Sequence, residues 1–166
     1  MISIEDYLAF VDDALDGMVS IVGELGDERA NRRPDIPGAN SPYIILTHCL
    51  GVMEYWGGYI VAGRPVERDR AAEFRAAGPV CGLVERAGRA RQQLRTDTAN
   101  VDPSALPRGT PRPEDVELPL GRTQGGALVH IYEELAQHRG HMEITRDLLL
   151  APWAQSTPTK RAAPGQ

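Results

Sequence analysis

The segment from residue 123 to residue 150 contains no proline, and its apolar residues recur at intervals of three and four. This spacing is typical of a helix that buries one face, so we predict one long helix here. The same segment contains Glu134, His138 and His141, with His130 one turn earlier. The apolar positions are Ala127, Leu128, Ile131, Leu135, Met142, Leu148 and Leu149.

Glu134 and His138 are four residues apart, which corresponds to about 6 Å of rise and about 40° of rotation along a helix. Their side chains should therefore project from the same face. A carboxylate and an imidazole are both good ligands for a divalent metal, and the ion offsets the cost of burying the carboxylate charge. The pair therefore predicts part of a metal site.

Three more long helices are predicted from periodicity and from their end signals. The first spans residues 3–25, with Ser3 as the N-cap, and ends at Gly26. The second spans residues 42–62 and has the strongest start signal, Ser41 followed by proline at the first helical position. The third spans residues 80–96, and its thinner apolar content places it at one side of the bundle.

Four long helices without an alternating strand pattern or an internal repeat predict an all-α four-helix bundle. We expect residues 1–150 to form this single domain and residues 151–166, rich in Ala, Pro and Thr, to be a disordered tail. Residues 69–77 predict a short helix. The proline-rich residues 97–122 predict a long connection over one end of the bundle.

Composition and charge exclude several classes of protein. A net charge of −5 argues against nucleic-acid binding, which requires a basic face. Residues 1–20 contain five acidic residues and no basic one, so we expect no signal peptide. The sequence contains no run of 18 uncharged apolar residues, so we expect no membrane-spanning helix. We therefore expect a cytoplasmic protein with Cys49 and Cys81 reduced.

His48 lies in the middle of the second predicted helix, on a face that should point inward. Alone, it would be interpreted as a hydrogen-bonded core residue. With Glu134 and His138 it forms a candidate three-ligand site that suits Zn or Ni and leaves positions for water or substrate. A fourth ligand from His130 or His141 would close the site and favour a structural role.

Two motifs carry a resemblance to a known family. They are Thr47-His48-Cys49-Leu50-Gly51-Val52-Met53-Glu54-Tyr55-Trp56 and Glu134-x-x-x-His138-Arg139-Gly140-His141, supported by Asn40-Ser41-Pro42 and Asp69-x-x-x-Glu73-Phe74. Together they resemble the DinB-like (YfiT-like) metal-binding family. That family includes S-transferases that use mycothiol or bacillithiol, and the metal-binding domain of maleylpyruvate isomerase is similar. The isomerase's C-terminal domain has no counterpart here, which argues against that reaction.

The resemblance implies an up-down-down-up bundle with a metal near one end, held by His48, Glu134 and His138. It implies a metal-dependent thiol S-transferase that conjugates a small thiol to electrophiles for detoxification. The arginine-rich composition, with Lys160 the single lysine, favours mycothiol as the thiol.

The sequence leaves two possible roles each for His141 and Tyr55. His141 stands where the family often has Gln or Asp. It is either a catalytic acid/base or the source of a hydrogen bond that orients a ligand. Tyr55 either lines the substrate pocket or is simply core, and His130 is expected to be a plain helix-face residue.

Two other classes compete with the transferase. One is a non-catalytic metal-binding stress-response bundle that acts through a partner or a dimer interface. The other is a metal-dependent hydrolase that uses bound water. A homodimer could form through the exposed side of the first or third long helix. A transferase requires an open metal position and a pocket between the second and fourth helices.

Overall fold

The computed structural model describes residues 2–112 and 119–151. Its long helices are α1 (Ile4–Asn31), α2 (Pro42–Val52), α4 (Val80–Thr98) and α6 (Gln124–Leu150). A π-helix, η1 (Met53–Val61), continues α2 without a break. Two short elements, α3 (Arg70–Glu73) and the 3-10 turn η2 (Pro119–Gly121), lie in the connections. The described ranges contain no strand.

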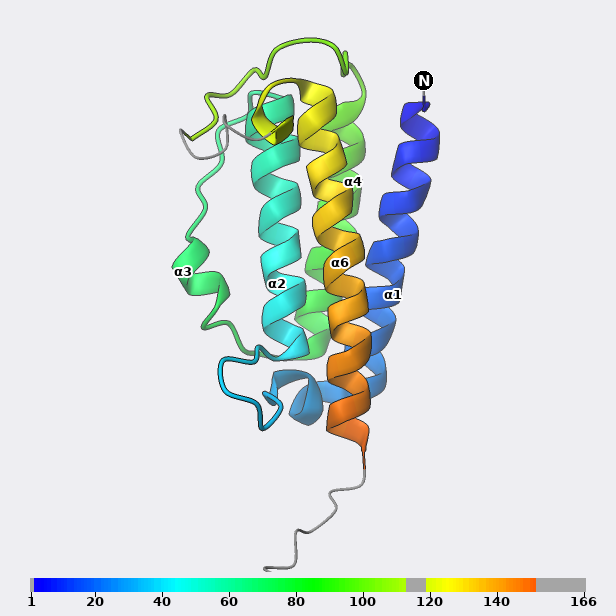
Figure 1. The fold of residues 1–166 in the computed structure, drawn as a ribbon, viewed down its shortest axis with the longest axis vertical. Coiled ribbons are helices and arrows are strands. Elements are labelled where there is room, and N and C mark those ends of the chain that lie inside the picture. Colours follow the sequence, from blue (N-terminus) through cyan, green and yellow to red (C-terminus); the bar gives the residue numbers. More distant parts are fainter. Residues whose placement is uncertain (1, 113–118, 152–166) are drawn as a thin grey trace, which may run out of the picture.

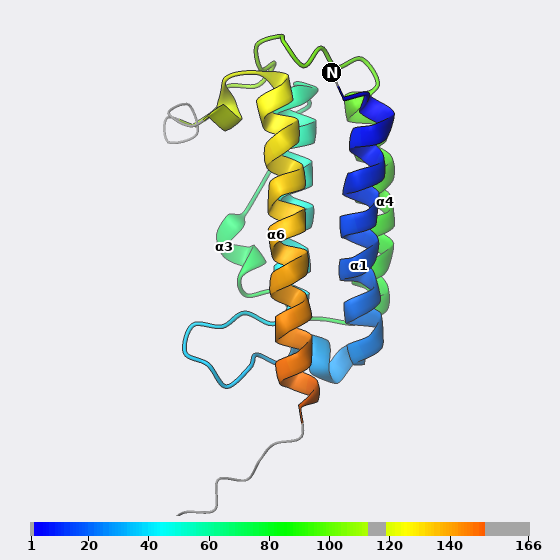
Figure 2. The same cartoon turned by 45° about the vertical axis from the view of Figure 1, so that its right-hand side comes forward.

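The helices form a bundle in which α2 and α4 run in the same direction and α1 and α6 run in the opposite one (Figures 1 and 2). Helix α6 packs against α1, α2 and η1, while α4 packs against α1, α2 and η1. The predicted all-α bundle with up-down-down-up connectivity is confirmed. Its consequence for the site is that α2 and α6 are antiparallel neighbours.

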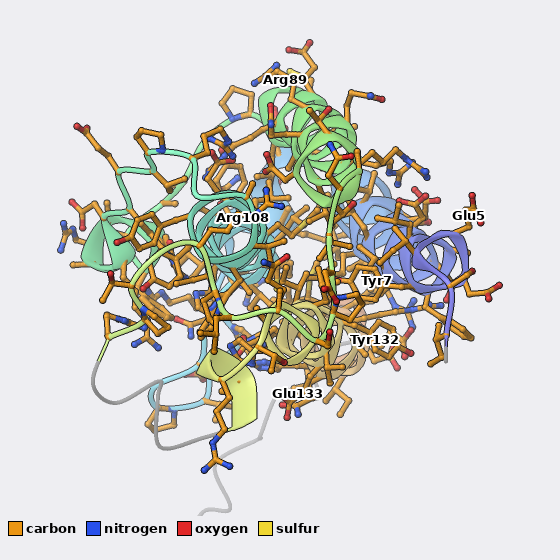
Figure 3. All side chains as sticks on the ribbon, turned by 90° about the horizontal axis from the view of Figure 1, so that it is seen from above. Glu5, Tyr7, Arg89, Arg108, Tyr132 and Glu133 are labelled. Carbon is orange, nitrogen blue, oxygen red and sulfur yellow. The ribbon has the colours of Figure 1, made fainter. Side chains whose placement is uncertain are left out.

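The core consists of apolar side chains that fill the space between the helices, as the view from above shows (Figure 3). The segment Pro42–Val61 is apolar enough to span a membrane, but 83% of its most apolar window is buried inside the bundle. Such burial is typical of a helix in the core of a bundle. The largest fully buried side chains include Leu15, Met18, Leu46, Leu50, Trp56, Ile131, Leu135 and Met142.

Helix α1 extends beyond its predicted end. Gly26 does interrupt the regular helix, with a φ of 65°, but the chain resumes helical geometry as far as Asn31. The side chain of Asn31 accepts a hydrogen bond from the amide of Gly78 and donates one to its carbonyl. The Asp27 carboxylate likewise accepts from the amide of Val80. The extra turn is therefore stabilised by hydrogen bonds to residues at the start of α4. Such long-range contacts cannot be predicted from the local sequence.

Helix α2 begins as predicted, because the Ser41 hydroxyl accepts a hydrogen bond from the amide of Ile44. The predicted helix over residues 42–62 is found, but from Met53 its turns are wider than those of an α-helix. The amide of Ala62 donates to the carbonyl of Gly57, five residues earlier. A short apolar stretch has no periodicity that distinguishes a π-helix from an α-helix.

Residues 99–112, which follow α4, cross the upper end of the bundle, as predicted (Figure 1). The amide of Arg108, labelled in Figure 3, donates to the carbonyl of Ile60 at the end of η1. The short helix α3 is shorter than the predicted 69–77, α4 ends two residues later than predicted, and η2 was not predicted. The expected tail falls on residues 152–166, outside the described residues.

We predict that Gly57→Ala lowers the free energy of unfolding by about 1–3 kcal/mol, because overpacking strains a filled core. A Cβ at Gly57 would lie 2.6 Å from Cδ1 of the buried Leu94. Gly88→Ala on α4 is the matched control: its Cβ meets nothing within 4 Å, so the better helix former should be neutral or stabilising. Urea unfolding measures both. A Gly57→Ala protein as stable as the control would contradict this packing.

Candidate metal centre

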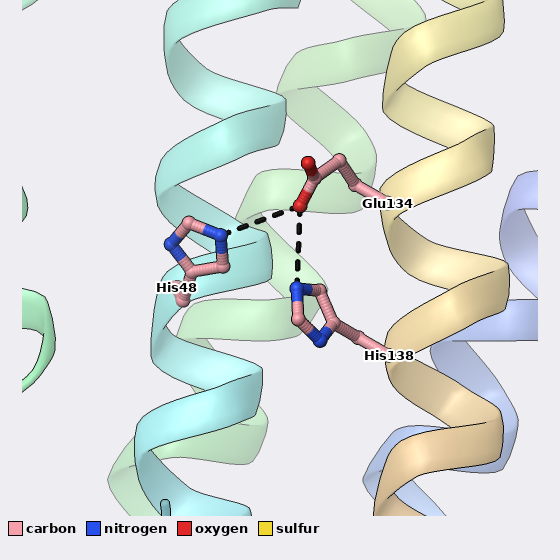
Figure 4. A group of neighbouring side chains, drawn as sticks. All are labelled: His48, Glu134 and His138. Carbon is pink, nitrogen blue, oxygen red and sulfur yellow. Dashed lines mark hydrogen bonds and ion pairs between the residues drawn. The ribbon is translucent and has the colours of Figure 1, made fainter. Parts of the chain in front are cut away.

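The three predicted ligands come together between α2 and α6 (Figure 4). His48 projects from α2, and Glu134 and His138 project from α6 one turn apart, as their spacing predicts. The side chain of His48 is almost entirely buried, whereas those of Glu134 and His138 are 27% and 29% exposed. The cluster is therefore closed on the α2 side and accessible from the α6 side.

The distances between the donor atoms fit a single ion. Oε2 of Glu134 lies 3.3 Å from Nε2 of His48 and 3.3 Å from Nε2 of His138, and all three atoms lie within 4.8 Å of one another. Two ligands about 2.0–2.1 Å from a tetrahedral zinc are about 3.4 Å apart. A typical N–H···O bond is shorter, about 2.9 Å. Two imidazoles and one carboxylate are also a donor set that first-row divalent metals accept.

The charges in this cluster are coupled. Hydrogen bonds from His138 and His48 hold the pKa of Glu134 far below its usual range, although burial opposes them. Burial lowers the pKa of His48, but hydrogen bonds to Glu134 and Glu73 more than reverse this, so the pKa is raised. The cluster therefore favours positive charge at its centre, and an ion binding there would displace a proton.

Glu73 is a buried residue that contacts this cluster and for which no role was predicted from the sequence. It lies at the end of α3, is only 6% exposed, and one of its oxygens, Oε2, is 2.8 Å from Nδ1 of His48. Arg68 donates to both oxygens of this carboxylate, at 2.6 and 3.0 Å. These bonds from His48 and Arg68 lower the pKa of Glu73 against the effect of burial.

Glu73 could not have been identified from periodicity, because it lies in a four-residue helix within a long connection. An isolated acidic residue in such a segment is usually solvated. The available signal was the motif Asp69-x-x-x-Glu73-Phe74, whose Asp69 caps α3 by accepting from the amide of Ala72. The motif marks the helix, but only the fold shows that α3 lies against α2.

His141 lies beside the cluster. The centroid of its ring is 6.0 Å from that of His138, and the two planes are tilted by 32°. Partial burial and the charge of His138 lower the pKa of His141, which favours the neutral imidazole near pH 7. Its side chain lines a cleft of about 300 Å³ between residues 34–40 and the last turns of α6. His141 therefore has access to both the cluster and a space for a ligand.

His130 is more enclosed than a plain helix-face residue. Its side chain is 13% exposed, its ring centroid lies 4.8 Å from that of buried Trp56, and Nε2 is 3.7 Å from Oε1 of Glu134. His130 also borders a larger cleft, of about 790 Å³, formed by α6 and η2 rather than by the two facing helices. That cleft is lined by Leu120, Gly126, Val129, His130, Glu133, Glu134 and Gln137.

Tyr55 lines neither of these two clefts. The guanidinium groups of Arg68 and Arg112 lie 5.9 and 5.4 Å from its ring centroid, and its ring packs on Trp56 and Tyr59. The residue thus supports the side of the cluster where Arg68 holds Glu73. Its predicted role in substrate binding stays a prediction.

The chain matches a protein-family model described as mycothiol-S-transferase over residues 6–151. The match includes α2, α3 and α6, and hence all residues of the cluster. No curated protein matches the sequence. The helical bundle agrees with the resemblance carried by the two motifs. Because the family model covers most of its length, the chain belongs to the mycothiol-S-transferase family.

Proposed function

We propose that this protein is a metal-dependent S-transferase that conjugates mycothiol to small electrophiles, and that His48, Glu134 and His138 bind its metal. The observation that carries the proposal is a three-donor cluster with ion-sized separations and one accessible side. Zinc is the first choice of metal and nickel the second, because imidazole and carboxylate suit both ions. The description of the matching family supports mycothiol as the thiol.

A bound divalent ion would lower the pKa of a thiol, so that the nucleophilic thiolate is present at neutral pH. The protein's own contribution is to hold the ligands and to keep the two substrates together. Buried His48 closes one side of the cluster, and the clefts beside Glu134 and His141 provide space on the other. Two separate spaces suit a reaction between two molecules.

His141 is the proposed acid/base in this reaction: its neutral imidazole takes the proton that the thiol loses, and the resulting imidazolium returns that proton to the product. When the thiolate sulfur attacks an epoxide carbon, the new C–S bond forms while the C–O bond breaks, and the resulting alkoxide takes a proton. When it attacks a double bond conjugated to a carbonyl, the electron pair moves to the carbonyl and the enolate takes the proton. The position of His141 between His138 and the smaller cleft makes it a candidate donor in both cases.

The competing classes have weaker support. A closed structural site would need a fourth ligand, but His130 lies 3.7 Å from the other oxygen of Glu134 and does not belong to the three-donor group. A hydrolase using bound water would need the same open site, and no further feature favours it. Detoxification in the cytoplasm and a homodimer accord with a mycothiol enzyme and are part of the proposal.

We predict that the purified protein binds one equivalent of zinc and that His48→Ala abolishes this binding, because two ligands are too few for a stable site. His130→Gln is the control and should retain the metal. Mass spectrometry and zinc titration provide the measurement. Loss of zinc in the control would indicate a fourth ligand and a closed site. If the wild type binds no zinc or nickel, the cluster is a hydrogen-bonded core network.

We predict that the zinc-loaded protein transfers mycothiol to an epoxide or a conjugated carbonyl compound. We also predict that His141→Asn lowers kcat at least about 100-fold, the lower end of the usual contribution of general acid–base catalysis. The KM for mycothiol and the zinc content should stay unchanged, because His141 is not a proposed ligand. Steady-state kinetics with thiol and electrophile varied separately measure this. Equal rates in both proteins would remove His141 from the mechanism.

A further inference from the structure

The shorter of the two carboxylate contacts of His48 lies on the α3 side of its ring, opposite Glu134. Nδ1 of His48 is 2.8 Å from Oε2 of Glu73, which is shorter than the 3.3 Å between Nε2 of the same ring and Glu134. An ionised carboxylate can only accept hydrogen bonds, so Nδ1 must carry the proton that it shares with Glu73. This bond leaves Nε2 as the nitrogen that can bind a metal.

Arg68 holds Glu73 as the charged acceptor. Its guanidinium donates to both oxygens of the carboxylate, a two-point contact that fixes the orientation of the carboxylate plane. Nη2 of Arg68 also lies 3.4 Å from Nδ1 of His48, but a guanidinium cannot accept a proton, and the bond to Glu73 is 0.6 Å shorter. Arg68 therefore acts on His48 through Glu73.

Gly51 leaves space on the surface of helix α2 for this carboxylate. A Cβ placed on Gly51 would lie 2.1 Å from Oε1 and 2.8 Å from Cδ of Glu73, and 3.2 Å from Nε of Arg68. Gly51 is three residues after His48, on the adjacent turn of the same face. Any larger residue there would push the carboxylate away from the imidazole.

The ring of His48 is also held from the side. Phe74, the residue after Glu73, has its ring centroid 5.3 Å from that of His48, with the planes tilted by 33°. The short helix α3 thus supplies both the acceptor for Nδ1 and an apolar contact for the ring. A segment that contributes no proposed ligand therefore determines how the most buried ligand is oriented.

We propose that Glu73, fixed by Arg68 and admitted by Gly51, is a positioning residue that holds His48 in the Nδ1-protonated tautomer with Nε2 directed at the metal. This inference rests on the proposed metal site and identifies the part of the chain that orients His48 within that site. Carboxylate partners of ligating histidines raise ligand basicity, and their loss typically costs about 10–100-fold in metal affinity.

The affinity test compares zinc dissociation constants, measured by competition with a chelator, for the wild type and three variants. Glu73→Gln should weaken binding about 10–100-fold, because it replaces the charged acceptor by an amide of the same shape. Gly51→Ala keeps every polar group and should weaken binding to a similar degree by displacing the carboxylate. Gly140→Ala on α6 meets nothing within 4 Å and should bind as the wild type does.

A spectroscopic readout separates orientation from general damage to the fold. In the zinc-loaded wild type labelled with ¹⁵N, we expect His48 to show a proton on Nδ1 and a metal-bound Nε2, and in Gly51→Ala a weakened Nδ1 proton signal. Circular dichroism checks that each variant is folded. The wild-type spectrum needs no variant, so it decides the tautomer even if a substitution prevents folding.

Each outcome decides the inference. Zinc bound through Nδ1, or equal affinities for the wild type, Glu73→Gln and Gly51→Ala, would overturn the role of Glu73 and leave the proposed function standing. A wild type that binds no zinc would overturn both. Weaker binding in the two site variants together with a protonated Nδ1 in the wild type would establish Glu73 as the positioning residue.

Discussion

The pairing of His48 with two carboxylates is the interaction on which the rest of the site depends. Glu73 and Glu134 contact opposite nitrogens of one buried imidazole, at 2.8 and 3.3 Å. Two negative charges at a helix interface are costly unless positive charge lies between or beside them. The positive charge of Arg68, which lies in the connection after η1, offsets the negative charge of Glu73. The groups beside Glu134 are the imidazoles of His48 and His138. A cation between α2 and α6 would complete this balance.

The bundle places this charged cluster so that its two sides differ. On the side formed by α2 and α3, His48 and Glu73 are buried, and this side supplies the hydrogen bond to Nδ1 and the Phe74 ring. The side formed by α6 is partly exposed and borders clefts at Glu134 and His141. Rigid support on one side and access on the other are what a binding site for a reactive ligand requires. The asymmetry arises because the short helix α3 packs against α2 and contacts His48.

Much of the fold and the ligand set could be predicted, and the failures have common physical causes. Helix starts at Ser3 and Ser41 were predictable because caps are local hydrogen bonds. The continuation of α1 beyond Gly26 and the π geometry of η1 were not, because contacts with other helices decide them. Glu73 was missed for the same reason, since its burial needs the space at Gly51, which comes from another helix.

The sequence by itself determined the helices, the bundle they imply and the alignment of Glu134 with His138, because all of these follow from spacing along the chain. Only the tertiary structure decided that His48 meets that pair, that Arg68 and Glu73 support it from behind, and that the clefts open beside α6. His48 is 20 or more positions away from Arg68, Glu73, Glu134 and His138 along the chain. Their geometry depends on how the helices pack, which no local pattern encodes.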